Sequence, residues 1–126
     1  MKQSWLIVDD VKGQRKVALD SSLYALGRDA DRCDIRLASQ FVSRHHATLV
    51  QLCHDDNTCY YRIVDGNLKG KLSANGLLVN GRKREAYDLQ HEDEIVFGPQ
   101  ARAVYYTIDP EASNRSHSPV SYSAAL

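Results

Sequence analysis

The residues of this chain whose types suit binding chemistry are a guanidinium, hydroxyls and a side-chain amide, and they fall in three polar segments. These segments are Gly27-Arg28, Ser43-Arg44-His45-His46 and Ser73-Ala74-Asn75-Gly76. Each one stands beside an apolar run, where a strand would give way to a loop. A cation, a hydroxyl and an amide supplied by separate loops can hold a phosphate through charge-assisted hydrogen bonds. The sequence therefore predicts a local anion-binding surface.

The segment 66–73 invites comparison with a nucleotide-binding P-loop, but it fails both requirements of that motif. Three residues separate Gly66 from Gly70, where a P-loop has four. Leu72 follows Lys71, where a P-loop has serine or threonine. The pattern does not predict nucleotide binding.

A serine nucleophile is the other enzymatic interpretation, because Ser43 is close to His45 and His46 in sequence. No G-x-S-x-G elbow surrounds Ser43, and an extended chain would hold Ser43 and His46 about 10 Å apart. We therefore expect no catalytic residues and no enzymatic activity.

The elements that must position these residues are short strands. Apolar or alternating runs bounded by turn residues predict strands at 5–8, 15–19, 23–26, 35–37, 47–52, 59–64, 77–79, 93–98 and 101–108. Their recurrence at about 8–12 residues is typical of a sandwich or barrel. No window repeats apolar residues at helical spacing, so the sequence predicts an all-β fold.

The connections between these strands also carry signals. Asn80-Gly81 predicts a type I′ turn, because both positions of that turn need a positive φ. Residues 82–84 continue from it as an edge strand, and residues 85–92 read as irregular and polar. The polar loop 65–73 is longer than a hairpin turn, and loops of that length in compact domains tend to be functional.

The composition excludes several classes of protein. Hydrophobic residues make up 43% and charged residues 25% of the 126 residues, which is typical of a globular domain. Basic and acidic residues are balanced at 16 each, which argues against a general binder of nucleic acid or of anionic membranes. No apolar run approaches the roughly 20 residues of a membrane span. The apolar run near the start of the sequence is too short for a signal peptide. We expect a cytoplasmic protein, with a monomer favoured.

Three cysteines, Cys33, Cys53 and Cys59, give an odd number without C-x-x-C spacing. This spacing predicts reduced thiols and no disulfide framework. Cys53, His54 and Cys59 could be imagined as zinc ligands, but tetrahedral zinc sites usually use paired spacings. We expect no metal and no cofactor.

The polar segments occur in an order that resembles a known family. Gly27-Arg28, Ser43 with His46 three residues later, Ser73 with Asn75-Gly76, and Asn80-Gly81 are similar to the motif of the forkhead-associated (FHA) domain. The match spans residues 5–108. The resemblance is to bacterial-type single-domain modules, and it implies a β-sandwich of about eleven mostly antiparallel strands. Loops at one end of such a sandwich bind phosphothreonine peptides, so the implied function is that of a signalling adaptor.

The resemblance also implies roles for individual residues. Arg28 would contact the phosphate or the adjacent peptide backbone, Ser43 would donate its hydroxyl to a phosphate oxygen, and Asn75 would hydrogen-bond the ligand main chain. The complete set of implied phosphopeptide-binding residues is Arg28, Ser43, Arg44, Ser73, Ala74 and Asn75. The residues implied to shape the loops are Gly27, His46, Gly76, Asn80 and Gly81.

One position departs from the family pattern. Ala74 stands where a threonine or serine commonly supplies a second hydroxyl, and Lys69, Lys71 or Arg44 could compensate with charge. The alternative function is therefore a protein interaction or assembly module on the same fold that does not depend on phosphate.

The composition changes after residue 108. Residues 109–126 are rich in serine and poor in apolar residues, which predicts a flexible tail or truncated linker after a sandwich domain at 1–108.

Overall fold

The computed structural model describes residues 2–109, so the tail predicted at 109–126 lies outside the described residues except for Asp109. The described residues form strands and turns with no helix, and hence no segment of them is a helix that could cross a membrane. The strands are β1 (Gln3–Asp10), β2 (Gly13–Leu19), β3 (Leu23–Gly27), β4 (Ile35–Arg36), β5 (Ala47–Cys53), β6 (Cys59–Asp65), β7 (Leu77–Val79), β8 (Arg82–Arg84), β9 (Ala86–Asp88), β10 (Glu94–Gly98) and β11 (Ala101–Ile108).

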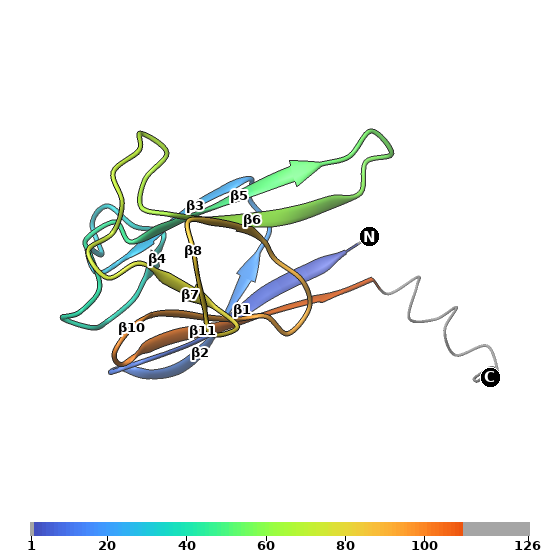
Figure 1. The fold of residues 1–126 in the computed structure, drawn as a ribbon. Coiled ribbons are helices and arrows are strands. Elements are labelled where there is room, and N and C mark those ends of the chain that lie inside the picture. The colour runs from blue at the N-terminus through green and yellow to red at the C-terminus, as the bar shows by residue number, and fades with distance from the viewer. Residues whose placement is uncertain (1, 110–126) are drawn as a thin grey trace.

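The strands form two sheets that pack face to face, as Figure 1 shows. One sheet has the order β2-β1-β11-β10-β7-β8 and the other the order β4-β3-β5-β6-β9. The pairing of β3 with β4 is parallel, and the other registered pairs are antiparallel. The predicted all-β sandwich of eleven mostly antiparallel strands is confirmed.

The core lies between the sheets and follows from the alternation of side chains along each strand. In β1, Leu6 and Val8 are fully buried, while Trp5 and Ile7, which alternate with them along the strand, face outward and are only partly buried. Leu49 of β5 and Ile63 of β6 are fully buried on the facing sheet. Burial of such a side chain contributes about 1.5–3 kcal/mol, so the alternation fixes which face of each strand points inward.

The turn between β7 and β8 has the predicted type I′ conformation, because Asn80 and Gly81 have φ angles of 51° and 84°. The strand that follows, β8, lies at the edge of its sheet as expected. Residues 85–92, however, are not wholly irregular. Within them β9 pairs with β6, in a register that sets Tyr87 opposite Ile63.

The prediction of reduced thiols is wrong for two of the three cysteines. Cys53 and Cys59 form a disulfide, and Cys33 is a free thiol. The physical reason is the register of the β5–β6 hairpin, which sets Cys53 directly opposite Cys59. Residues 2–109 contain no group of three potential metal ligands, so the structure offers Cys53, His54 and Cys59 no zinc site.

The connections β3–β4, β4–β5 and β6–β7 meet at one end of the sandwich, at the left of Figure 1. We call these three connections the recognition loops. The β5–β6 hairpin, which carries the disulfide, extends toward the opposite end. The topology therefore brings residues near positions 28, 43 and 74 together.

Candidate functional site

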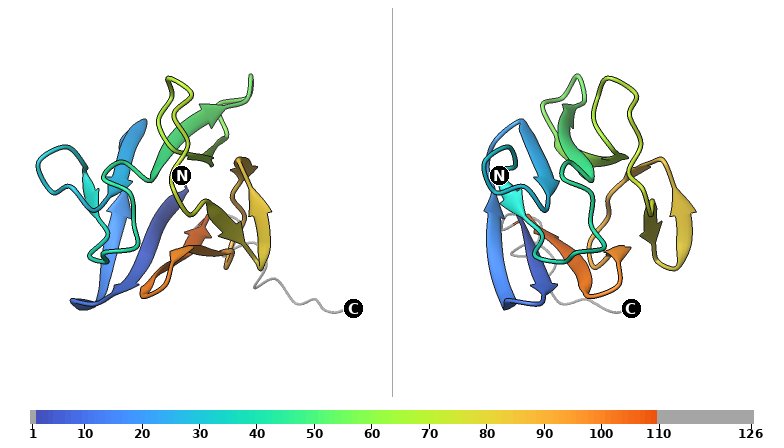
Figure 2. Two further views of the ribbon diagram at one scale, coloured as in Figure 1. Left: turned by 60° about the vertical axis from the view of Figure 1, so that its left-hand side comes forward. Right: turned by 90° about the vertical axis from the view of Figure 1, so that its left-hand side faces the viewer.

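Backbone hydrogen bonds hold the recognition loops against one another. The amide of Arg28 donates to the carbonyl of Ser43 at 3.1 Å, and the amide of Asp29 donates to the carbonyl of Arg44 at 3.3 Å. The amide of Gly66 donates to the carbonyl of His46 at 2.7 Å. The β4–β5 loop thus lies between the other two loops, and Figure 2 shows this end of the sandwich facing the viewer in its right-hand view.

Gly27 allows the close approach of the β3–β4 and β4–β5 loops. A Cβ atom at this position would lie 2.0 Å from the carbonyl oxygen of Arg44, a distance at which the backbone would have to move. The thiol of Cys33 donates to the same carbonyl at 3.0 Å. Burial raises the pKa of Cys33, and Asp29 and Asp34 raise it further, so the thiol keeps the proton that it donates.

His46 joins the β4–β5 loop to the β6–β7 loop. Its ring is fully buried, and each ring nitrogen has one partner. The amide of Ser43 donates to Nδ1 at 3.0 Å, and Nε2 donates to the carbonyl of Gly76 at 2.8 Å. These partners assign the neutral tautomer with the proton on Nε2.

The environment of His46 favours this neutral form. Burial lowers its pKa below the usual value of 6.5, and this effect outweighs the opposing influences of the Gly76 carbonyl and of Asp65. A protonated ring would present a second N–H toward the amide of Ser43 and lose that hydrogen bond. His46 is therefore not available as a general base, and no other side chain of residues 2–109 is hydrogen-bonded to the hydroxyl of Ser43.

Arg28 is exposed but oriented. Its Nε donates to the carbonyl of Val42 at 3.0 Å, which fixes the direction of the side chain along the β4–β5 loop. Within residues 2–109 the structure shows no carboxylate paired with Arg28. The neighbouring Asp29 pairs instead with Arg32 at 3.6 Å. The terminal guanidinium nitrogens can therefore meet a ligand.

Ser43 and Ala74 meet across the site. The amide of Ala74 donates to the hydroxyl oxygen of Ser43 at 2.9 Å. No acceptor for the hydroxyl proton of Ser43 is present among the described residues, so that proton is available to an anion. The side chain of Ala74 is exposed, and Ala74 and Ser43 line the same hollow between the recognition loops.

Ser73 and Asn75 point elsewhere. The hydroxyl of Ser73 accepts from the amide of Gly76 at 2.9 Å, and its own amide donates to the buried carboxylate of Asp65 at 3.0 Å. Asn75 donates from Nδ2 to the carbonyl of Phe41 at 2.6 Å, which leaves its Oδ1 as an acceptor. Both residues shape the β6–β7 loop, and neither lines the hollow beside Ser43.

Asn80 and Gly81 lie apart from the recognition loops, at the β7–β8 turn. The side chain of Asn80 donates to Asp93 at 2.8 Å and accepts from the amide of Glu94 at 2.9 Å. The structure therefore gives Asn80 a role in joining β7 to β10.

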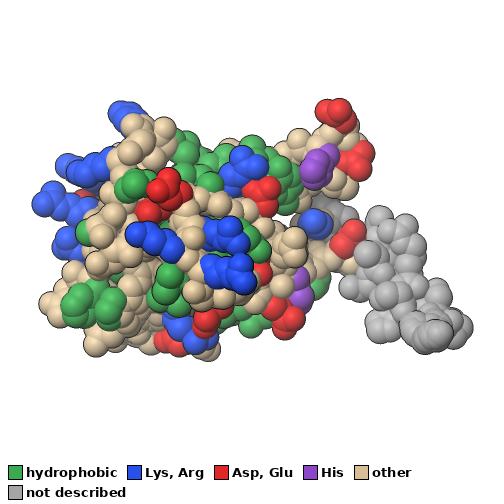
Figure 3. All heavy atoms as spheres, viewed as in Figure 1, with side chains coloured by type: hydrophobic (Ala, Val, Ile, Leu, Met, Phe, Trp, Pro, Cys, Tyr) green, Lys and Arg blue, Asp and Glu red, His purple; other side chains and the backbone are tan. Residues whose placement is uncertain are grey.

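A hollow of about 590 Å³ lies between the recognition loops, and we call it the loop cleft. It is lined by Arg28, Arg32, Ser43, Arg44, His45, Asn67, Lys71, Leu72 and Ala74. Four of these side chains are cationic and none is a carboxylate. Figure 3 shows lysine and arginine side chains gathered at this end of the molecule. Arg32, His45, Asn67 and Leu72 were not among the predicted binding residues, although the polar loop 65–73 was expected to be functional.

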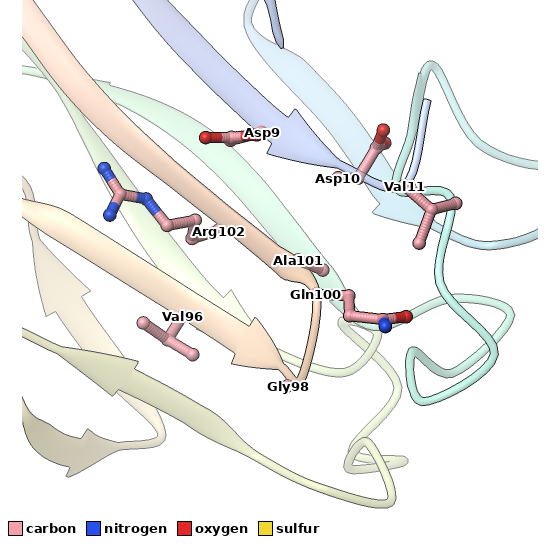
Figure 4. Close-up of a pocket in the computed structure, with 8 residues that line it drawn as sticks. All are labelled: Asp9, Asp10, Val11, Val96, Gly98, Gln100, Ala101 and Arg102. Carbon is pink, nitrogen blue, oxygen red and sulfur yellow. The ribbon is translucent and has the colours of Figure 1, made fainter. Parts of the chain in front are cut away.

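A second surface hollow, of about 520 Å³, lies where β1 ends and β10 turns into β11. Figure 4 shows its lining, which includes the side chains of Asp9, Asp10 and Arg102. The carboxylate of Asp10 already has hydrogen-bond partners within the protein, since it accepts from the amide of Ala38 at 2.8 Å and from the guanidinium of Arg15. Two carboxylates at this hollow disfavour an anion, so the loop cleft is the better anion site.

Comparison with known proteins agrees with this architecture. The family model described as FHA domain matches residues 24–98, which is more than half of the chain. The uncharacterized protein sll1895 of Synechocystis sp. is 33% identical over 108 residues, which are 84% of this chain and 15% of that protein. The chain thus spans only a small part of the length of this curated relative.

Two solved structures are similar over most of the chain. The Slr1951 protein from Synechocystis sp. is 47% identical with a TM-score of 0.77, over 82% of this chain and 96% of that chain. EmbR of Mycobacterium tuberculosis, solved in complex with a low affinity phosphopeptide, is 30% identical with a TM-score of 0.62, over 82% of this chain and 24% of that chain. By its sequence match, its two-sheet fold and its structural neighbours, this chain belongs to the FHA domain family, whose members are protein interaction modules.

Proposed function

We propose that this domain binds threonine-phosphorylated segments of partner proteins and holds the phosphate in the loop cleft. The observation that carries this proposal is the lining of the cleft, which holds four cations, a hydroxyl with an unused proton and no carboxylate, although one of the cations, Arg32, is paired with Asp29 at 3.6 Å. A phosphothreonine carries a charge of about −1.5 to −2 at pH 7 and offers three acceptor oxygens. Its charge and its acceptors match what the cleft supplies.

Each residue has a definite part in the proposed complex. The guanidinium of Arg28, held along the β4–β5 loop by its bond to Val42, donates to phosphate oxygens. Ser43 donates its free hydroxyl proton to the phosphate. Asn75, which donates one N–H of Nδ2 to the carbonyl of Phe41, accepts an N–H of the ligand main chain through Oδ1.

The cations of the cleft compensate for the missing hydroxyl at position 74. Lys71 and Arg44 line the cleft beside Ala74, and neither is paired with a carboxylate within residues 2–109. Charge near a phosphate is favourable without fixed geometry. Lys69, the third candidate from the sequence, does not line the cleft.

The partner is proposed to be a protein and not nucleic acid or a membrane, since the cleft fits a single phosphorylated side chain. The cytoplasmic location, the signalling role and the monomeric state expected from the sequence stay predictions.

A degenerate phosphothreonine peptide library, offered to the domain beside the same library without phosphate, tests the proposal. We expect retention of the phosphorylated library only, and loss of retention in Arg28→Ala. Arg82→Ala, which removes an exposed cation of β8 outside the cleft, serves as the matched control and should retain peptides like the wild type.

Equal retention of both libraries would overturn the proposal. That result would instead favour the phosphate-independent interaction module, which is the alternative function suggested by the absence of a hydroxyl at Ala74.

A further inference from the structure

A third hollow, of about 340 Å³, adjoins the loop cleft on the outer face of β3. Tyr24 and Leu26 of β3 are buried in the core, so Leu23 and Ala25, which alternate with them along the strand, point outward and line this hollow. Leu68 of the β6–β7 loop lines it as well, and the polar residues Asp34, His45, Thr48, Asn67 and Lys69 complete the lining. We call this hollow the apolar groove.

The two leucines of the apolar groove are unusually open to solvent. Leu23 is 51% and Leu68 58% exposed. A single exposed leucine on a protein surface needs no explanation, but two that line one hollow beside a binding cleft form an apolar surface with no covering among residues 2–109.

The loop that carries Leu68 is held in shape by its own hydrogen bonds. The side-chain oxygen of Asn67 accepts from the amides of Lys69 and Lys71 at 2.9 and 3.0 Å. The amide of Asn67 donates to the carbonyl of Lys71 at 3.0 Å, and the hydroxyl of Thr48 donates to the carbonyl of Gly66 at 2.9 Å. Leu68 is therefore presented on a pre-organised loop, which lowers the entropic cost of using it in binding.

The apolar groove is continuous with the loop cleft. His45 and Asn67 line both hollows and form the wall that they share. His45 is itself fixed, because its Nε2 donates to the hydroxyl of Thr48 at 2.9 Å. A peptide chain that leaves the cleft across His45 passes directly over the groove.

We propose that the apolar groove takes one apolar side chain of the same phosphorylated segment, and that Leu68 and Leu23 select it. This proposal rests on the proposed function. The groove volume is at the lower end of the roughly 300–1,000 Å³ of ligand pockets, which suits one side chain better than a helix or a second domain. The cleft thus reads the phosphate, and the groove reads a neighbouring aliphatic or aromatic residue.

Position-specific selection from an oriented phosphothreonine library tests this assignment. We expect the wild type to enrich aliphatic or aromatic residues at one fixed position near the phosphothreonine. A peptide with leucine at that position should bind about tenfold more tightly than its serine counterpart. Leu68→Ser should remove this preference and keep the dependence on phosphate.

Ile108→Ser is the matched control, since Ile108 is 39% exposed and ends β11 away from the recognition loops (Figure 1). This variant should keep the preference. Phosphate-dependent binding without any apolar preference, or a preference that survives Leu68→Ser, would overturn the assignment and leave the proposed function intact. A wild type that retains no phosphorylated peptide would overturn both. A change of oligomeric state in Leu68→Ser, with unchanged peptide selection, would show that the groove holds a second copy of the chain.

Discussion

The substitution Ala74→Thr should tighten the binding of a phosphothreonine peptide. Ala74 lines the loop cleft, and its amide already supports the hydroxyl of Ser43 at 2.9 Å. A threonine side chain at this position would place a second hydroxyl beside the first, without disturbing that backbone contact. The phosphate would then accept one more hydrogen bond.

The size of the gain follows from the exposure of the site. A hydrogen bond to a charged group contributes about 1.5–3 kcal/mol, but ordered water at an exposed position offsets part of it. A net gain of about 1 kcal/mol remains, which corresponds to roughly fivefold in affinity. Little change in the free energy of unfolding is expected, because Ala74 is exposed and its side chain has no packing to lose.

Calorimetry with a matched pair of phosphorylated and unphosphorylated peptides measures this effect. Ala74→Val is the control, since valine has the shape of threonine without its hydroxyl. The reasoning is refuted if Ala74→Thr binds no more tightly than Ala74→Val, or if it gains equally for both peptides.

Three further outcomes are expected. His46→Ala should lower the free energy of unfolding by about 3 kcal/mol in urea titrations, because the amide of Ser43 and the carbonyl of Gly76 lose their partner at a fully buried site. Because folding lowers the pKa of His46, the stability that the neutral ring contributes to the folded state is complete above pH 6.5 and is lost as the pH falls below that value. Urea midpoints should therefore fall less between pH 7.5 and 5.5 in His46→Gln than in the wild type. Replacing Cys53 and Cys59 together by serine should lower the free energy of unfolding by about 2 kcal/mol, as expected for a short closed loop, and should leave peptide affinity unchanged because the hairpin points away from the cleft (Figure 1).

Each of these expectations has a contradicting result. An unchanged urea midpoint in His46→Ala would show that the ring does not tie the loops together. A pH dependence identical to that of the wild type in His46→Gln would assign the titration to another group. A reducing agent that shifts the midpoint of the double serine variant as much as that of the wild type would show that the shift does not come from the disulfide.

Most of the strands could be predicted from the sequence, because apolar alternation and turn residues are local signals. The strand β9 could not, since Ala86-Tyr87-Asp88 contains too few apolar residues to stand out. Its conformation comes from pairing with β6, which places Tyr87 opposite Ile63. Strand propensity in so short a segment is decided by its neighbours.

The disulfide was missed for a related reason. The spacing of Cys53 and Cys59 matches no familiar motif, and their proximity depends on the register of the β5–β6 hairpin. The polar segment between them, together with the symmetric placement of the cysteines about it, was the signal that could have revealed the pair.

The loop cleft was predicted in outline. The motif residues Arg28 and Ser43 could be identified because they stand at strand ends in a recognisable order. Arg32 and Leu72 could not, because they line the cleft only through the path of long loops. Ser73 and Asn75 were both expected to contact the ligand. The structure turns the hydroxyl of Ser73 into its own loop, whereas it leaves Oδ1 of Asn75 as an acceptor.

The most direct test of the central claim is the map of backbone amide chemical shifts on adding one phosphothreonine peptide, beside the same peptide without phosphate. The account predicts that the phosphorylated peptide shifts the amides of Arg28, Ser43 and Ala74 most strongly, and that the unphosphorylated peptide leaves them unchanged at the same concentration. Shifts that are the same for both peptides, or that concentrate on the outer face of the sheet formed by β1, β10 and β11, would contradict it.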